Sequence, residues 1–113
     1  MTTLLALAML AIQFVHNSPN TPVITAPVVR FQLPPDVNEC HLTPPFKMNV
    51  VVSLTVGIDG NAHDARIVHS SGNACVDKRE VYAASRYRFT PAMKESKPQP
   101  MSITMNMNVS SGK

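Results

Sequence analysis

Hydrophobic and polar residues alternate along two stretches of the chain, and this period of two predicts two long β-strands. In residues 50–58 the even-numbered positions are apolar, which predicts an inward-facing side that ends with Ile58. In residues 101–109 the odd-numbered positions are apolar, and serine, threonine and asparagine occupy the positions between them. Each predicted strand therefore has one side in the core and one side in solvent.

A return strand is expected after the first of these strands, because Asp59-Gly60 is typical of a two-residue type I′ hairpin turn. Such a turn pairs residues whose numbers sum to about 119, so that Val50 lies opposite His69. The inward side of the return strand then carries His63, Ala65, Ile67 and His69.

Residues 73–88 are predicted to form the one helix of the chain. Asn73 suits the N-cap position, and Asp77 in the first turns complements the positive end of the helix. Pro91 is expected to end the helix. The residues that face the sheet recur at helical spacing and are mostly small; they are Val76, Glu80, Ala83, Ala84 and Tyr87.

These elements predict an α+β fold, a small β-β-α-β domain in which a helix packs on one face of a three-stranded antiparallel sheet. Because the helix returns over the sheet, the third strand pairs with the first, and the strand order is 2-1-3. The third strand is therefore an edge strand. Residues 101–109 contain none of the charges or prolines that usually prevent an edge from pairing with another chain.

An unprotected edge of this length predicts β-augmentation, in which an extended segment of a partner adds a further strand. Coverage by the C-terminal tail, or pairing with a second copy of the chain in a homodimer, is the alternative. The predicted partner-binding residues are Met101, Ser102, Ile103, Thr104, Met105, Asn106, Met107 and Asn108.

The N-terminal part of the chain has a different composition from the rest. Residues 4–15 are mostly apolar and too few to cross a bilayer, which suits the hydrophobic region of a signal peptide. A short membrane-anchor segment is the alternative, because no lysine or arginine precedes them. The predicted domains are residues 1–16, the signal peptide or anchor; residues 17–45, an extended Pro-rich linker; and residues 46–113, the folded domain.

Charge and motif content argue against two classes of function. The net charge is +3, with the basic residues scattered and no interleaved aromatic residues, so we expect no nucleic acid partner. The chain carries no arrangement for nucleophilic catalysis and no phosphate-binding loop. We therefore predict a protein that is not an enzyme and needs no cofactor.

The two cysteines, Cys40 and Cys75, fit no CxxC redox or zinc pattern. Both lie beyond the open end of the predicted hairpin, and a domain of this size often needs a cross-link. We therefore predict a structural disulfide formed in an oxidising compartment. Two buried free thiols are the alternative.

Two histidines share a predicted face and methionines share another, a combination of side chains that suits copper. His63 and His69, however, would lie about 20 Å apart along one strand. Alternating methionines more often fill a core. We predict no metal site, and a copper-binding periplasmic protein is the less favoured alternative.

Three motifs follow one another between the second and third predicted strands. Ser70-Ser71-Gly72 ends a strand, Val76-Asp77 opens the helix, and residues 87–92 (YRFTPA) close it. In this order and spacing, the motifs resemble those of the C-terminal domain of the TonB family of periplasmic energy transducers. The resemblance covers roughly residues 46–110, and Glu80 stands where that family usually has alanine.

The resemblance implies an exported, periplasmic domain that binds by recognition. In that family, the strand that corresponds to residues 101–109 receives the TonB box, a short extended segment of outer-membrane receptors. A complete transducer also has its N-terminus at the inner membrane and contacts motor proteins there during energy transduction for transport. A free periplasmic adaptor or decoy of the same fold, without energy coupling, is the alternative.

Overall fold

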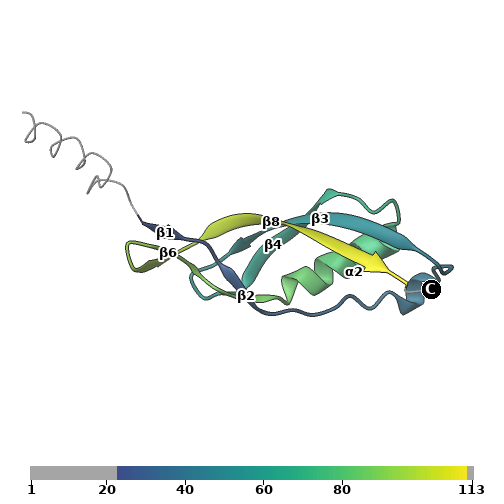
Figure 1. Ribbon diagram of the computed structural model, residues 1–113, viewed down its shortest axis with the longest axis horizontal. Helices are drawn as coiled ribbons and strands as arrows, with labels where there is room; N and C mark the ends of the chain where they lie inside the picture. The colour runs from purple at the N-terminus through teal and green to yellow at the C-terminus, as the bar shows by residue number, and fades with distance from the viewer. Residues whose placement is uncertain (1–22, 112–113) are drawn as a thin grey trace, which may run out of the picture.

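The computed structural model describes residues 23–111 and shows a curved three-stranded sheet with one helix beneath it (Figure 1). The sheet consists of β3 (Lys47–Val56), β4 (Ala62–His69) and β8 (Met101–Ser110), and the helix is α2 (Ala74–Ser85). Both pairings are antiparallel, in the order β4-β3-β8. The predicted α+β arrangement is confirmed, because β3, β4 and β8 are the first, second and third predicted strands.

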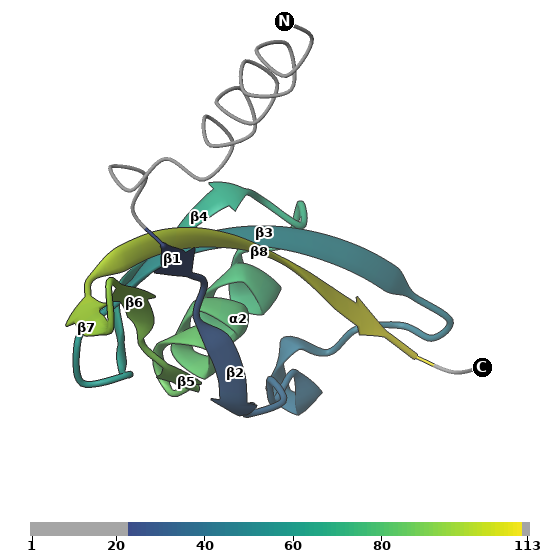
Figure 2. The ribbon, with the colours of Figure 1, turned by 60° about the vertical axis from the view of Figure 1, so that its left-hand side comes forward.

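Two smaller sheets extend this arrangement beyond the predicted three strands. β1 (Ile24–Thr25) pairs with β6 (Ala92–Lys94), which also pairs with β7 (Lys97–Gln99). β2 (Val28–Phe31) pairs with β5 (Arg88–Thr90). In Figure 2, β2 and α2 lie on the same side of the large sheet. The order of elements within the described residues is therefore more complex than β-β-α-β.

Residues 24–31 lie within the segment for which the sequence predicts an extended linker. They are extended, and their backbone pairs with the residues that follow the helix. All four residues of β2 are exposed, whereas Val37, Cys40 and Leu42, further along the segment, pack against the core. The short 3-10 helix η2 (Asn38–Cys40) lies within the second of these parts.

The predicted signal peptide or anchor, residues 1–16, lies outside the described residues. Within residues 23–111, no helix is long and apolar enough to cross a membrane.

The core lies between the large sheet and α2. The alternation along β3 correctly predicts most of the side chains that this strand buries there. Side chains at the even-numbered positions of β3 from Val50 to Val56 are 0–2 % exposed. Burial of each of them contributes roughly 1.5–3 kcal/mol. Ile58 was predicted to continue this side and is 61 % exposed, because β3 ends at Val56 and the chain turns away. The buried apolar cluster consists of Val50, Val52, Leu54, Val56, Val76, Ala84, Phe89, Met107 and Val109.

Helix α2 supplies small side chains and one carboxyl group to this core. Ala83, Ala84 and Val76 are fully buried, as their helical spacing predicts. Glu80 is also buried, and its Oε1 has no hydrogen-bond partner among the described residues. Burial raises the pKa of Glu80, because the charged form loses its hydration there.

The turn between β3 and β4 is longer than the predicted type I′ turn. The Gly60 N–H donates to the Gly57 carbonyl at 2.9 Å, and the Gly57 N–H donates to the Asn61 carbonyl at 3.0 Å. Gly60 has a φ of 81°, whereas Asp59 is not in the left-handed region. A turn followed by one left-handed residue gives a three-residue hairpin loop, so the predicted turn type is wrong.

The three-residue turn corrects the predicted orientation of His63, and the register shift between Ile67 and His69 corrects that of His69. Val51, and not Val50, lies opposite His69, and Thr55 lies opposite His63. Val51 and Thr55 face away from the core, so both histidines are exposed instead of inward-facing. The two other residues of the predicted inward side do pack against the core; they are Ala65 and Ile67.

Helix α2 begins where the sequence predicts and ends earlier. The Asn73 Oδ1 accepts hydrogen bonds from the N–H groups of Cys75 and Val76 at 2.9 and 3.1 Å, which confirms the predicted N-cap. The helix ends at Ser85, and residues 88–90 form β5. Pro91 therefore does not set the end of the helix: the chain becomes extended before it, where it pairs with β2.

Candidate functional site

The candidate site is the outer edge of β8. β8 pairs with β3 over ten residues without a register shift, from the Lys47–Ser110 pair to the Val56–Met101 pair. Within residues 23–111, no strand pairs with its other side. A regular edge strand of this length leaves a row of backbone donors and acceptors available to a partner.

The ladder between β3 and β8 shows which backbone groups are available. The Ser111 N–H donates to the Phe46 carbonyl at 2.9 Å. In an antiparallel ladder, hydrogen-bonded pairs alternate with non-hydrogen-bonded pairs, so the odd-numbered residues of β8 bond to β3. The N–H and C=O groups that point away from β3 are therefore those of Ser102, Thr104, Asn106, Asn108 and Ser110.

Side-chain contacts between the two strands agree with this assignment. The Asn49 Nδ2 donates to the Asn108 Oδ1 at 2.9 Å, and the hydroxyl oxygens of Thr55 and Ser102 are 3.3 Å apart. Side chains come closest in non-hydrogen-bonded pairs. Even-numbered residues of β8 therefore place their side chains on the open face of the sheet and their backbone groups along the free edge.

The eight predicted partner-binding residues all lie on β8, and the structure divides them into two sets. The four even-numbered residues are exposed on the open face. Of the odd-numbered residues, Met107 is buried, whereas Met101, Ile103 and Met105 are half-buried beneath the sheet. Their side chains thus occupy opposite faces of one edge.

The other edge of the sheet, β4, is irregular. Its register with β3 shifts at two places, where β4 contains an extra residue. Asp64, at one of these shifts, has a φ of 58°, which is uncommon for a residue other than glycine. The Arg66 Nη2 lies 3.4 Å from the Asp64 Oδ2, so two charges also lie on this strand. Bulges and charges both hinder pairing with a further strand.

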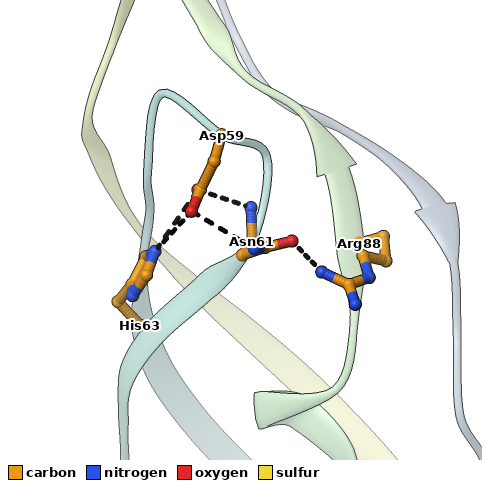
Figure 3. Close-up of polar contacts among 4 residues, drawn as sticks. All are labelled: Asp59, Asn61, His63 and Arg88. Carbon is orange, nitrogen blue, oxygen red and sulfur yellow. Dashed lines mark hydrogen bonds and ion pairs between the residues drawn. The ribbon is translucent and has the colours of Figure 1, made fainter.

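Polar contacts hold the turn that leads into β4 (Figure 3). The Asp59 Oδ1 accepts a hydrogen bond from the Asn61 N–H at 2.9 Å and lies 3.3 Å from the His63 Nε2. The Arg88 guanidinium donates to the Asn61 Oδ1, which links the turn to β5. The hydrogen bond from Asn61 lowers the pKa of Asp59. His63 therefore belongs to a turn network at the β4 edge.

This placement separates the groups that could have held copper. His63 and His69 are exposed on β4, whereas the methionines of β8 face the core on the other side of β3. In the part of the chain that the structure describes, no group of three or more histidine, cysteine, aspartate or glutamate side chains could hold a metal ion.

The Ser70-Ser71-Gly72 motif connects the end of β4 to α2 through Asp77. The Asp77 Oδ1 accepts hydrogen bonds from the Ser71 N–H at 2.9 Å and the Ser71 Oγ at 2.6 Å, and its Oδ2 accepts from the Ser70 Oγ. Partial burial disfavours the charged form, but these hydrogen bonds outweigh it and lower the pKa of Asp77. Gly72 has a φ of 93°, which glycine adopts readily. The motif fixes the strand-to-helix turn.

Cys40 and Cys75 form a disulfide with their Cα atoms 5.6 Å apart, as the sequence predicts. The bond joins η2 to the first turn of α2. Close to it, the Arg79 Nη2 donates to the Glu39 Oε1 at 2.9 Å. These two links attach the N-terminal segment to the helix, and neither involves β8.

Sequence reasoning missed the five short strands outside the large sheet. Residues 28–31 (VVRF) are mostly β-branched or aromatic and lie between Pro27 and Pro34, which is a recognisable strand signal. The β6–β7 turn carries no such signal, because Glu95 and Ser96 adopt φ values of 53° and 69° without a glycine.

Comparison with known families agrees with the arrangement of strands and motifs. The family model described as Gram-negative bacterial TonB protein C-terminal matches residues 48–108, which is more than half of the chain. The matched range begins in β3 and ends in β8, and so contains the ladder between them from the Asn49–Asn108 pair to the Val56–Met101 pair. No curated protein matches the chain.

Proposed function

Because the chain belongs to the Gram-negative bacterial TonB protein C-terminal family, we propose that it binds an extended, TonB box-like segment of an outer-membrane receptor by strand addition to β8. The family is periplasmic and consists of non-catalytic protein-interaction domains whose members interact with outer-membrane receptors. The observation that carries the proposal is the row of outward backbone groups on β8, set against the irregular β4.

Strand addition to β8 displaces no strand within residues 23–111, because none pairs with its outer side. The outward N–H and C=O groups recur at every second residue, which is the spacing that an extended partner presents along its own edge. Each backbone hydrogen bond contributes about 0.5–1.5 kcal/mol net, so several in a row supply affinity that depends little on the outward side chains. The binding residues of this proposal are Met101 to Asn108.

A titration with receptor-derived peptides tests the proposal. The peptides come from the periplasmic N-termini of outer-membrane receptors encoded in the same genome, and binding is followed by calorimetry. Thr104→Pro and Asn106→Pro each remove one outward N–H, and proline is tolerated where a donor faces away from the sheet. We expect both variants to lose peptide binding while keeping their helix content.

Alanine at the same two positions is the matched control, because it keeps the N–H and removes the side chain. Thr104→Ala and Asn106→Ala should change the affinity by less than about threefold. If the wild-type protein binds none of the peptides, or if both proline variants bind normally while folded, β8 is not the recognition edge. Sedimentation of the wild-type protein alone shows whether a second copy occupies this edge instead.

The proposal extends to energy transduction in transport if residues 1–16 remain attached and associate with the inner membrane, where motor proteins act. Mass spectrometry of the mature N-terminus, combined with membrane fractionation, separates a transducer from a free periplasmic adaptor. A retained N-terminus in the inner-membrane fraction supports the transducer. A processed N-terminus near the Pro-rich segment supports the adaptor.

A further inference from the structure

The inward side of β8 is covered unevenly along its length. Met107 and Val109, in the second half of the strand, are 8 % and 6 % exposed and belong to the buried cluster. Met101, Ile103 and Met105, in the first half, are half-buried. The first half of β8 therefore presents apolar surface beneath the same edge that carries the outward backbone groups.

A strand added to this edge would place its own side chains beside these residues. Residues directly opposite one another on neighbouring strands point to the same face, with Cβ atoms about 4.5–5.5 Å apart. Every second residue of the added strand would therefore lie beside Met101, Ile103 or Met105, on the helix side of the sheet. The residues between them would lie beside Ser102 and Thr104 on the open face.

We propose that the half-buried row of Met101, Ile103 and Met105 selects extended peptides with an apolar side chain at every second position and places them on the first half of β8. This inference rests on the proposed strand addition and adds the side-chain pattern of the partner. Apolar side chains gain by covering the row, whereas polar side chains there lose hydration without a partner. Between the apolar positions, the partner meets hydroxyl and amide groups and can be polar.

Two of the three residues in the row are methionines, and this affects how strictly the row discriminates among apolar side chains of the peptide. Its side chain is unbranched and flexible, so it adapts to neighbours of different shape. Surfaces rich in methionine accept varied apolar partners for this reason. The row therefore distinguishes apolar from polar side chains and discriminates little among valine, leucine and phenylalanine.

Two labelled peptides of equal composition test the inference by fluorescence anisotropy. The first alternates, Thr-Val-Ser-Val-Ser-Val-Thr, and the second places the same residues in blocks, Val-Val-Val-Thr-Ser-Ser-Thr. An added strand of the first peptide directs all three valines to one face, which the second cannot do. We expect the alternating peptide to bind about tenfold more tightly, because more apolar area is buried.

Variants of the row identify it as the cause of the preference. The double variant Met101→Ser, Met105→Ser should reduce the preference to less than about threefold, since the apolar surface is lost. Met105→Leu should retain it. Val68→Ser is the matched control, because Val68 is 59 % exposed but lies on β4. Circular dichroism establishes that each variant is folded.

The outcomes separate this inference from the proposed function. If receptor-derived peptides bind but the alternating and block peptides bind equally or not at all, the side-chain pattern is wrong and strand addition stands. If the preference persists in the folded double variant, the row is not its cause and the inference fails. If no peptide of any kind binds, strand addition itself is overturned.

Discussion

β8 and β4 are the two edges of one sheet and share β3 as their neighbour, yet their outer sides differ. β8 follows β3 for ten residues without a shift and carries no charge between Met101 and Val109. β4 shifts register twice, has a residue at positive φ and carries the Asp64–Arg66 ion pair. A regular, uncharged edge is therefore a property of β8 alone, and does not follow simply from the small number of strands in the sheet.

The difference has a physical basis in how each strand is built. Every extra residue in β4 leaves its backbone groups out of line with those of its neighbours, so a partner strand cannot bond to it continuously. In β8 the outward groups keep one spacing from end to end. Edge strands without such irregularities are sites where other chains add. The comparison thus favours β8 over β4 as the edge for the proposed strand addition.

The largest expected effect is on the free energy of unfolding, and it differs between proline substitutions at two neighbouring residues of β8. Met105→Pro should lower the free energy of unfolding by about 3 kcal/mol, because it removes an N–H that bonds to β3 and disturbs the strand. Thr104→Pro should cost less than about 1 kcal/mol, since its N–H faces outward. Urea unfolding of both variants measures the difference. Equal losses would show that the assigned ladder is wrong.

Loss of the disulfide should affect stability and spare recognition. Cys75→Ser should lower the free energy of unfolding by about 2–4 kcal/mol, because the bond closes a long loop. The bond lies at the start of α2, and the helix packs against β4 and β3. Peptide affinity of the folded variant should match that of the wild type, as measured by calorimetry. A large loss of affinity would mean that the edge of β8 depends on the N-terminal segment.

One replacement made on both edges compares them directly. Asp64→Val should lower the free energy of unfolding by about 1–3 kcal/mol, because a β-branched residue is strained at positive φ. Thr104→Val should change it by less than about 0.5 kcal/mol, since both residues suit a regular strand. Thermal unfolding of the two variants gives the comparison. Similar values would indicate that the Asp64 bulge is absent in solution.

The smallest expected effect is the pH dependence of stability that arises from Asp77, at the turn between β4 and α2. The folded pKa of Asp77 lies below its ordinary value of 3.8, so its contribution to stability is present above that pH and is lost as the pH falls through the folded pKa. Asp77→Asn should be less stable than the wild type near neutral pH. The two curves should converge below the folded pKa. Urea unfolding between pH 7 and pH 2 measures this, and parallel curves would contradict it.

Much of the large sheet could be predicted from sequence, because alternation directly reports which side of a strand is buried. Val50 to Val56 and Met101 to Val109 face the core at the predicted positions. Asn73 caps the helix, and Cys40 and Cys75 form the expected disulfide. These features depend on neighbouring residues or on a single pairing between two cysteines.

The outward histidines could not be predicted, because the length of the turn and each bulge change which side of the strand the later residues face. A regular two-residue hairpin pairs Val50 with His69, whereas the three-residue turn places Thr55 opposite His63 and an extra residue in β4 places Val51 opposite His69. The early end of α2 escaped prediction for a similar reason. Residues 88–90 form a strand because β2, more than fifty residues earlier, pairs with them.

The sequence by itself determined the three main strands, the helix cap, the disulfide and the lack of charge on β8. Each follows from local patterns or from residue type. The tertiary structure alone decided which backbone groups of β8 point outward, that β4 is bulged, and that Met101 to Met105 are half-covered while Met107 is buried. These depend on how separate segments pair and pack, and local patterns carry no record of register or coverage.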